Sequence, residues 1–571
     1  GGFMEALAEL RASQDAPAAL QACEALSCAL LPSGAPPSEL FDECSFDLFP
    51  ALLRAAAWRL CRPVASALLF RMAELASPRE LYCLEMEAFA LHPAPQSQLL
   101  LLRLLAATLP QIRRRRSEFL VGCLRSLRSR FLDTWPATEW AEGAVDDDDE
   151  PVPSSQLFDA LDGVVAPLAA DAADEPADSA HHAREAVLRF YWQLLLLTCT
   201  TAGLEDASAR VLALLDSCAI RLPATQLQLL SRLPAATAAG EAEPPPSKGA
   251  EVPHSEEAEE QAATRRSAMG MALHLHNLYA SSPPPGADAL RQQLAAMDAT
   301  SRLSLAARAA PLLLRQPALA ARGNALLLAA IEAWLPHPPT GPRPPPATPP
   351  APSLDREASA ALEACAHALA GHMARHPEQR ERAHAHHTLQ TLLWVWAPVE
   401  RRRVIRELID SCPYANAVAL LITRLKDEHL FEKEAAARVA SPVEAEAAFD
   451  AAALLLVLEP LLTGFAAAES DPLATVDSLM ATLNLTRFVL ADKNATLDQG
   501  TLRRLRCSRL EPLDLHLRRC MDSMWSRMQD MERGCGQDES SNVELTSMRT
   551  DFTHLHLAAE IAQRAIEMCK G

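Results

Sequence analysis

The amino-acid sequence predicts an all-α protein, and three observations support this fold class. Alanine and leucine dominate the chain, aromatic residues make up only 5% of it, and β-branched runs with period two are scarce. Apolar residues recur every three or four positions almost throughout, as they do on one face of a helix. Helix-start signals agree with this pattern, because Pro78 follows Ser77 and Asp355 precedes "REASAALEACAHAL".

The intervals between the predicted helices are short, which favours helical hairpins. The 571 residues show no strong sequence repeat, but hairpins in this number are typical of HEAT and armadillo proteins, whose units run to about 40 to 47 residues. We therefore expect a HEAT/armadillo-like helical-repeat solenoid in two or three blocks. Two or three compact helical bundles are the alternative architecture.

Three stretches rich in proline or acidic residues predict irregular linkers. They are residues 141–155 ("AEGAVDDDDEPVPSS"), 234–262 (which contain "EAEPPPSK" and "HSEEAEE") and 336–353 ("PHPPTGPRPPPATPPAPS"). The predicted blocks are an N-terminal block (1–140), a middle block (156–335) with a disordered insert at 234–262, and a C-terminal block (354–571). A ligand for a proline-recognising domain is an alternative interpretation of the last linker.

The charge of the chain argues against proteins that bind polyanions or anionic membranes, and its cysteine pattern argues against a disulfide-rich secreted protein. The chain carries 53 basic and 73 acidic residues, a formal net charge of −20, so the whole molecule repels polyanions and anionic membrane surfaces. Fourteen cysteines without a CxxC pair indicate reduced, buried thiols. The chain shows no signal-peptide pattern, and no apolar run reaches the roughly 20 residues of a membrane span. We expect a soluble protein of the cytoplasm, with the nucleus as a further location.

The common catalytic motifs GxGxxG, GxxxxGK[ST], HExxH and GxSxG do not occur in the sequence. We therefore expect neither enzymatic activity nor a cofactor. The nearest group of chemically active residues lies on one predicted helical hairpin and comprises Cys365, His367, His372, His376, His384, His386 and His387. Zinc would require three or four of them to converge. Solvated imidazoles on a polar helix face are the simpler interpretation, so we expect no metal.

Four consecutive arginines, Arg113 to Arg116, interrupt an otherwise apolar region in "PQIRRRRSEFL". Such a run fits a nucleic-acid patch, a nuclear import signal or the solvated corner between two helices. Pro110 breaks the preceding apolar helix, and cations are favourable at the carbonyl end of that helix. The corner is therefore the favoured interpretation, because the acidic balance of the chain opposes nucleic-acid binding.

Near the C-terminus, "SLMATLNLTRFVLADKN" predicts an amphipathic helix. Leu479, Leu483 and Leu490 form a core stripe at helical spacing, while Asn484 and Arg487 share another face. Polar and apolar residues that follow the stripe complete a candidate partner-binding surface: Asp492, Lys493, Arg503, Arg504, Arg506, Leu510, Pro512 and Leu513. An ordinary hairpin with solvated charges is the alternative.

Five segments carry a resemblance to a known family. Three occur in order between residues 46 and 131: "FDLFPALLRAAAWRLCRP", "MAELASPRELYCLEMEAFA" and "SQLLLLRLLAATLPQIRRRRSEFLVGCLRSLRSRF". Two lie in the C-terminal block: "RRRVIRELIDSCPYANAVALLITRLKDEHL" and "DSLMATLNLTRFVLADKNATLDQGTLRRLRCSRLEPLDLHLRRC". Together they resemble the glomulin family, which includes the plant aberrant lateral root formation protein and fungal relatives. The middle block and the proline-rich linkers depart from the family pattern.

The resemblance implies a HEAT-like protein whose C-terminal domain binds the RING subunit of cullin-RING (SCF-type) ubiquitin ligases. By covering the surface used by the ubiquitin-conjugating enzyme, such a protein inhibits by occlusion and performs no chemistry. Two rival functions stay open. One is a scaffold for another client, in kinetochore or stress-response signalling, and the other is a nucleic-acid-binding protein that uses Arg113 to Arg116.

Overall fold

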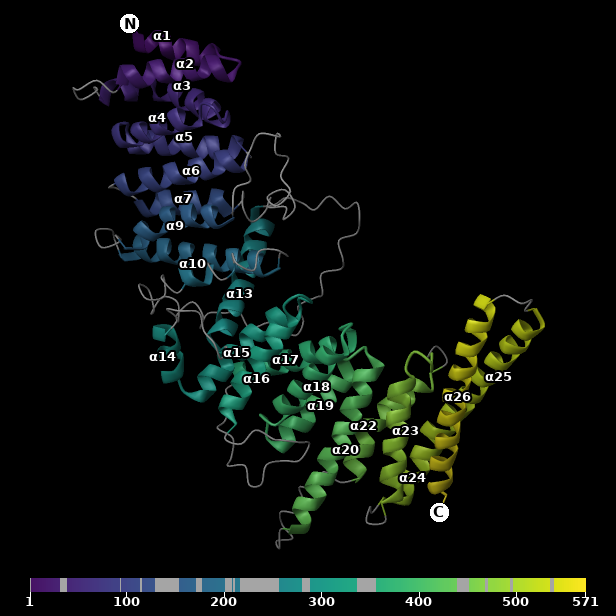
Figure 1. The fold of residues 1–571 in the computed structure, drawn as a ribbon. Helices are drawn as coiled ribbons and strands as arrows, with labels where there is room; N and C mark the ends of the chain where they lie inside the picture. The colour runs from purple at the N-terminus through teal and green to yellow at the C-terminus, as the bar shows by residue number, and fades with distance from the viewer. Residues whose placement is uncertain are drawn as a thin grey trace. The chain divides into compact units, whose positions relative to one another are not determined.

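Helices account for nearly all of the residues that the structure describes. The computed structural model describes residues 2–30, 38–92, 94–112, 116–128, 154–170, 177–200, 208, 211–215, 256–279, 288–335, 356–438, 451–467, 471–492, 497–534 and 539–570. These ranges contain no strand, and helices cover more than half of the whole chain (Figure 1). The predicted all-α class is therefore confirmed.

Unit 1 is the first of two compact units and ends at Asp298. Its helices are α1 (Gly2–Ala12), α2 (Ala16–Leu30), α3 (Ser38–Ala57), α4 (Arg62–Leu75), α5 (Pro78–Leu91), α6 (Pro95–Thr108), η1 (Leu109–Gln111), α7 (Arg116–Arg128), α9 (Ser154–Ala170), α10 (Ala177–Thr200), α13 (Glu256–Tyr279) and α14 (Asp288–Ala296). Helices close in sequence pack together, among them α1 with α2, α3 with α4, α6 with α9, α7 with α10 and α10 with α13. This succession of neighbouring pairs is the packing of a helical-repeat solenoid.

Unit 2 begins at Ala299 and repeats the same kind of packing. Its helices are α15 (Ala299–Leu314), α16 (Ala320–Trp334), α17 (Arg356–Arg375), α18 (Gln379–Leu393), α19 (Pro398–Ser411), α20 (Ala415–Arg438), α22 (Ala451–Phe465), α23 (Val476–Ala491), α24 (Gln499–Leu505), η4 (Arg506–Leu510), α25 (Glu511–Gly534) and α26 (Glu539–Met568). The main pairs are α15 with α16, α17 with α18, α20 with α23, and α25 with α26. In Figure 1 they follow one another from teal to yellow.

The two units differ from the three blocks that the sequence predicts. Their boundary falls between Asp298 and Ala299, inside the predicted middle block, since α15 and α16 pack on α17 and α18. The predicted insert 234–262 is also wrong at its end, because α13 begins at Glu256. That stretch, "EEAEEQA", consists of strong helix formers, and its acidic residues lie at the N-terminal end of a helix, where negative charge is favourable. The predicted linker 141–155 is wrong at its last two residues, because α9 begins at Ser154. The rest of that linker, residues 234–255 of the predicted insert and the linker 336–353 lie outside the described residues.

Helix starts follow the predicted signals closely. Pro78 opens α5 directly after Ser77, and α17 begins at Arg356, directly after Asp355. The four-arginine run falls between the end of η1 and the start of α7. Arg113 to Arg115 lie outside the described residues, and Arg116 is the first residue of α7.

Unit 1 buries several polar groups between its helices. Glu85 of α5 is fully buried and accepts a hydrogen bond of 2.7 Å from the Thr108 hydroxyl. Burial raises the pKa of Glu85 to about 8, although the Thr108 hydrogen bond opposes this rise. Between α10 and α13, the Trp192 indole N–H donates to Nδ1 of His274 over 3.2 Å. Burial lowers the pKa of His274 to about 4, so this imidazole is neutral at pH 7.

None of the described helices is long and apolar enough to cross a membrane. The cysteines that the structure describes carry free thiols. Several of them, including Cys23, Cys61, Cys123 and Cys365, are buried, as expected for small apolar side chains.

Candidate protein-binding surface

Helix α23 carries the predicted core stripe. Leu479 and Leu483 are fully buried, which confirms their predicted place, and Leu490 is half-buried. Asn484 is exposed and Arg487 is half-buried, and both lie on a different face of α23 from the leucine stripe. These two side chains are therefore accessible on a helix whose opposite face is packed in the core.

The far end of α23 is fixed to α20 by an ion pair. A carboxylate oxygen of Asp492 lies 2.6 Å from the Lys433 ammonium. Asp492 is therefore held towards α20 and is mostly shielded. Lys493, the next candidate residue, lies outside the described residues.

Helix α24 begins with a side-chain cap at Asp498. Its carboxylate accepts hydrogen bonds from the Thr501 amide, at 2.8 Å, and from the Thr501 hydroxyl, at 2.6 Å. The hydroxyl and amide hydrogen bonds of Thr501 lower the pKa of Asp498. This cap is the arrangement that orients the first turn of a helix, and it positions the exposed Arg503 and Arg504 that follow.

Two of the candidate arginines form ion pairs on the molecule itself. Nε of Arg504 lies 3.5 Å from Glu459 of α22, and Nε of Arg506 lies 3.4 Å from Glu511. No ion pair of Arg487 or Arg503 forms within the described part of the chain. The accessible positive charge of this surface therefore centres on Arg487 and Arg503.

Leu510 and Leu513 are fully buried, so the prediction that they contact a partner is wrong. The chain stays helical through α24, η4 and α25. The turn η4 is a π-helical turn, which absorbs one additional residue. Proline lacks the N–H of a regular α-helix and its ring crowds the carbonyl four residues earlier, so a widened turn beside Pro512 accommodates it. Pro512 itself is exposed.

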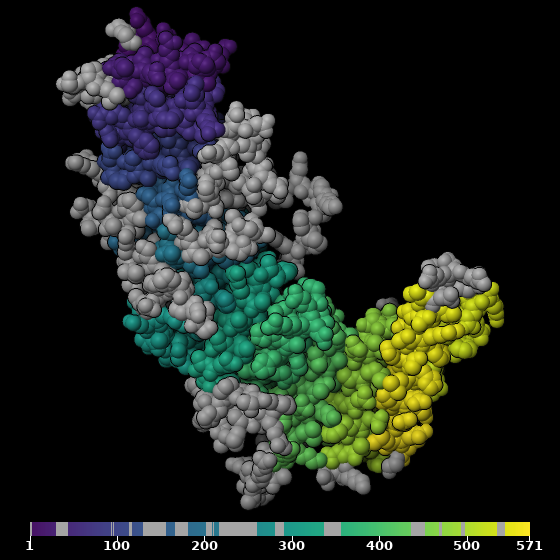
Figure 2. Space-filling model, in the orientation of Figure 1, coloured from purple at the N-terminus to yellow at the C-terminus, as the bar shows by residue number. Residues whose placement is uncertain are grey.

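Two exposed apolar side chains on α25 are absent from the predicted surface. Leu515 and Trp525 are both 50% exposed, and the Trp525 ring lies 5.6 Å, between centroids, from Phe552 of α26. Both lie off the buried stripe of α25 that contains Leu513 and Met528. Apolar residues that do not follow the helical spacing of such a stripe are the sequence signal that would have identified them. Figure 2 shows α25 and α26, in yellow, as an exposed surface. Tryptophan and arginine are the residue types that most often dominate protein interfaces.

Three consecutive arginines of α19, which packs on α20 and α17, have different environments. Arg401 is buried, and its Nε lies 2.8 Å from Glu428 of α20. Arg402 forms an ion pair with Glu432. The Arg401 guanidinium also lies over the Trp394 ring, 4.4 Å from its centroid. The buried carboxylate of Glu428 is also 2.6 Å from Arg424, so one carboxylate is shared by two arginines that both lie over the Trp394 ring.

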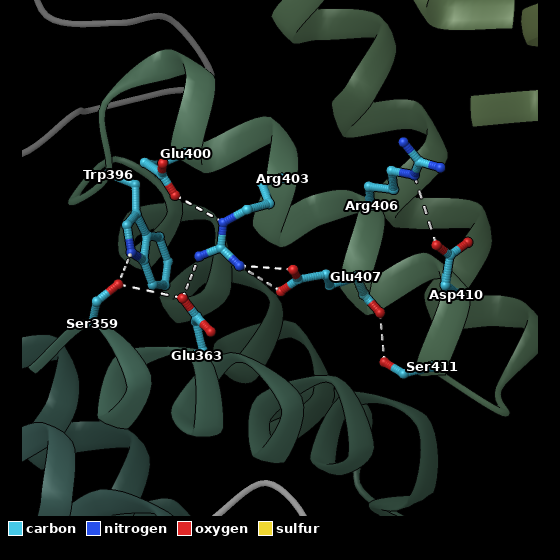
Figure 3. Close-up of polar contacts among 9 residues, drawn as sticks. All are labelled: Ser359, Glu363, Trp396, Glu400, Arg403, Arg406, Glu407, Asp410 and Ser411. Atoms are coloured by element: carbon cyan, nitrogen blue, oxygen red, sulfur yellow. Dashed lines mark hydrogen bonds and ion pairs between the residues drawn. The ribbon is translucent and has the colours of Figure 1, made fainter. Parts of the chain in front are cut away.

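Arg403, by contrast, lies at the surface and ties α19 to α17 (Figure 3). Its guanidinium contacts Glu400 at 2.8 Å and Glu407 at 2.7 Å on its own helix, and Glu363 of α17. Hydrogen bonds to Glu400, Glu363 and Glu407 raise the pKa of Arg403. Figure 3 also shows that the Trp396 indole N–H donates to the Ser359 hydroxyl. The Ser359 hydroxyl in turn donates to the carboxylate of Glu363. The network holds α17 and α19 together.

The cysteine–histidine group does not converge. Cys365 donates its thiol hydrogen bond to the carbonyl of Ala307 at 3.1 Å, and burial raises the pKa of this thiol. The rings of His372 and His376 lie 4.7 Å apart, between centroids. Among the described residues, no three histidine, cysteine or acidic side chains lie where they could hold one metal ion.

Residues 344–547 match the family described as "Uncharacterised protein family, YAP/Alf4/glomulin". The matched range runs from before α17 into α26 and covers just over a third of the chain. The resemblance seen in the C-terminal segments is therefore confirmed. The N-terminal segments lie outside the matched range, and no curated protein matches the chain.

Proposed function

Taking the match of residues 344–547 to the glomulin family as premise, we propose that unit 2 binds the RING subunit of a cullin-RING ubiquitin ligase. The proposed contact face comprises Asn484, Arg487, Arg503, Pro512 and the neighbouring part of α25. The proposal rests on the family match over residues 344–547 together with two arginines inside that range, Arg487 and Arg503, that form no ion pair in the described part of the chain. A chain with net charge −20 that keeps such a face accessible is suited to an acidic patch on its partner.

The proposed mechanism is occlusion. A stable interface buries about 800 Å² on each partner, enough to cover the RING surface that recruits the ubiquitin-conjugating enzyme. The two proteins then compete for one surface, so the inhibitor needs neither a cofactor nor chemistry of its own. We infer that the protein acts as a non-enzymatic regulator in the cytoplasm, and also in the nucleus where its ligase is present.

A ubiquitin-transfer assay tests this function with the full chain and a neddylated cullin-RING ligase. The full chain should inhibit ubiquitin transfer and should displace the ubiquitin-conjugating enzyme. Truncating a central interface arginine typically costs about 2 kcal/mol, so Arg487→Ala should weaken RING binding roughly thirtyfold. Arg380→Ala removes an exposed arginine on α18 and serves as the matched control.

Two outcomes would contradict different parts of the proposal. If Arg487→Ala inhibits as strongly as the unchanged protein, the binding face is misassigned. If the unchanged protein leaves recruitment of the ubiquitin-conjugating enzyme intact, the inhibitor function is wrong.

A scaffold for another client is the second candidate function, because the matched family description names YAP and Alf4 beside glomulin. A scaffold of this kind, in kinetochore or stress-response signalling, would use the same helical surfaces without affecting ubiquitin transfer. Nucleic-acid binding is the remaining rival. It predicts an affinity for generic DNA or RNA that falls steeply with salt, which a salt-titrated binding assay measures directly.

A further inference from the structure

Unit 1 contains a cavity of about 660 Å³ between α7, α10 and α13. Cavities of this size are typical of ligand sites. Its lining combines basic, polar and apolar side chains: Val121, Leu124, Arg125, Ser126, Arg128, Ala186, Arg189, Phe190, Gln193, Glu260, Ala263, Thr264 and Ser267. The cavity lies outside the range that matches the glomulin family, and its role is independent of the function proposed for unit 2.

The cavity is predominantly cationic. Arg125 and Arg128 line it from α7 and Arg189 from α10, against the carboxylate of Glu260 on α13. Arg189 is bound to Glu185, its Nε lying 3.0 Å from the carboxylate. Nε of Arg128 is buried and has no hydrogen-bond partner among the described residues. Arg125 and Arg128 are therefore available to an anion.

A buried amide supplies the second polar feature. The side chain of Gln193 is 5% exposed, and its Nε2 donates to the Ala263 carbonyl at 2.8 Å and to the Ser267 hydroxyl at 2.6 Å. The Ser267 hydroxyl donates in turn to the Ala263 carbonyl at 2.9 Å. These bonds fix the orientation of the amide and leave Oε1 as a buried acceptor without a donor in the described part of the chain.

The two polar features together define the chemistry of a ligand. Arginine binds carboxylates and phosphates through paired N–H groups, whereas Oε1 of Gln193 requires a hydrogen-bond donor. Inorganic phosphate at neutral pH offers mainly acceptors, but an acidic peptide supplies a carboxylate and a backbone N–H within one or two residues. Val121, Leu124 and Phe190 add an apolar wall for a neighbouring side chain.

We propose that this cavity binds an acidic peptide segment of a partner protein. A carboxylate of the peptide binds Arg125 and Arg128, a backbone N–H donates to Oε1 of Gln193, and an apolar side chain packs on Phe190. Buried polar atoms usually have a hydrogen-bond partner. In the proposed complex, the backbone N–H of the peptide is the partner of Oε1 of Gln193.

Fluorescence anisotropy with the full chain tests the proposal. The probe is a fluorescein-labelled hexapeptide of alternating glutamate and leucine, and the control probe carries glutamine in place of glutamate. The acidic peptide should bind at least tenfold more tightly than the neutral one. The double variant Arg125→Gln/Arg128→Gln should abolish that preference, whereas Arg54→Gln on α3, outside the cavity, should retain it.

The role of Gln193 is tested on the ligand, because substitution of the residue would also remove its bonds to Ala263 and Ser267. Methylation of one backbone nitrogen at a time should reveal one position where affinity falls about tenfold. Equal binding of the acidic and neutral peptides overturns the proposal, as does a double variant that stays folded by circular dichroism and binds normally. Full competition by inorganic phosphate or by an oligothymidylate of equal charge also overturns it, since those probes offer no backbone N–H.

Discussion

Glu85 provides the clearest test of how burial determines stability in unit 1. Its carboxyl is fully buried, one oxygen accepts from Thr108, and the other has no partner within the described residues. Burial raises the pKa of Glu85 to about 8 from its ordinary value of 4.5. The folded protein therefore keeps a proton that the unfolded chain releases between these two pH values.

The sign of the pH dependence follows from this difference in proton binding. Since the folded state holds the extra proton, raising the pH from about 4.5 to about 8 destabilises it, by about 1.4 kcal/mol per pH unit. At pH 7 the loss amounts to about 3 kcal/mol. Glu85→Gln removes the ionisation but keeps an oxygen that accepts from Thr108. The variant should therefore be about 3 kcal/mol more stable than the unchanged protein at pH 7, and nearly equal to it at pH 4.5.

Urea denaturation between pH 4.5 and 8 measures this difference. Unfolding should be followed by hydrogen exchange and mass spectrometry of peptides from α5 and α6, so that unfolding of unit 2 is not counted. Parallel pH profiles for the two proteins would refute the reasoning, because they would show that Glu85 does not titrate differently in the folded state.

Three further substitutions probe the packing. Gly270→Ala places a methyl group against the Trp192 backbone carbonyl, so α10 and α13 should separate at a cost of roughly 1–3 kcal/mol or more, seen as faster hydrogen exchange in both helices. Glu428→Ala leaves buried arginine charge uncompensated and should lower the free energy of unfolding, measured by urea denaturation, by about 3–5 kcal/mol. Arg403→Ala at the surface should lower it by about 1 kcal/mol or less. Equal losses would contradict the burial assigned to the two ion pairs. Leu483→Ala should destabilise unit 2 by about 2–5 kcal/mol while the remaining folded fraction binds RING normally, and a stable but non-binding variant would place this side chain in the interface instead.

The sequence predicted the features that depend on local periodicity and on helix-start chemistry. Leu479 and Leu483 are buried because their spacing follows the helical repeat, and α5 starts at Pro78 because proline suits a first turn. These rules concern residues a few positions apart, so no tertiary information is needed to apply them.

Features that depend on distant parts of the chain were not predictable in the same way. The ion pair of Lys433 with Asp492 and the bond from Gln193 to Ala263 join parts of the chain that are not neighbours in the sequence. Their partners are ordinary polar residues whose meeting follows only from the stacking of helices. Glu85 was missed for the same reason, because a single glutamate in a helical pattern gives no sign that both of its oxygens are buried.

The π-helical turn at Arg506–Leu510 determines which side chains of the following helix, α25, face the interior and which face solvent. Each residue of an α-helix rotates the chain by about 100°, so removal of one residue from the turn, such as Ser508, would turn all of α25 by about that angle against α24. Leu515 and Trp525 would exchange their exposed positions for contact with the interior, and leucines now inside would face water. A length change of one amino acid here would thus alter the identity of a whole exposed helix face without altering any residue on it. Alignments of related chains should therefore place insertions and deletions at this turn before assigning equivalent surface residues on α25.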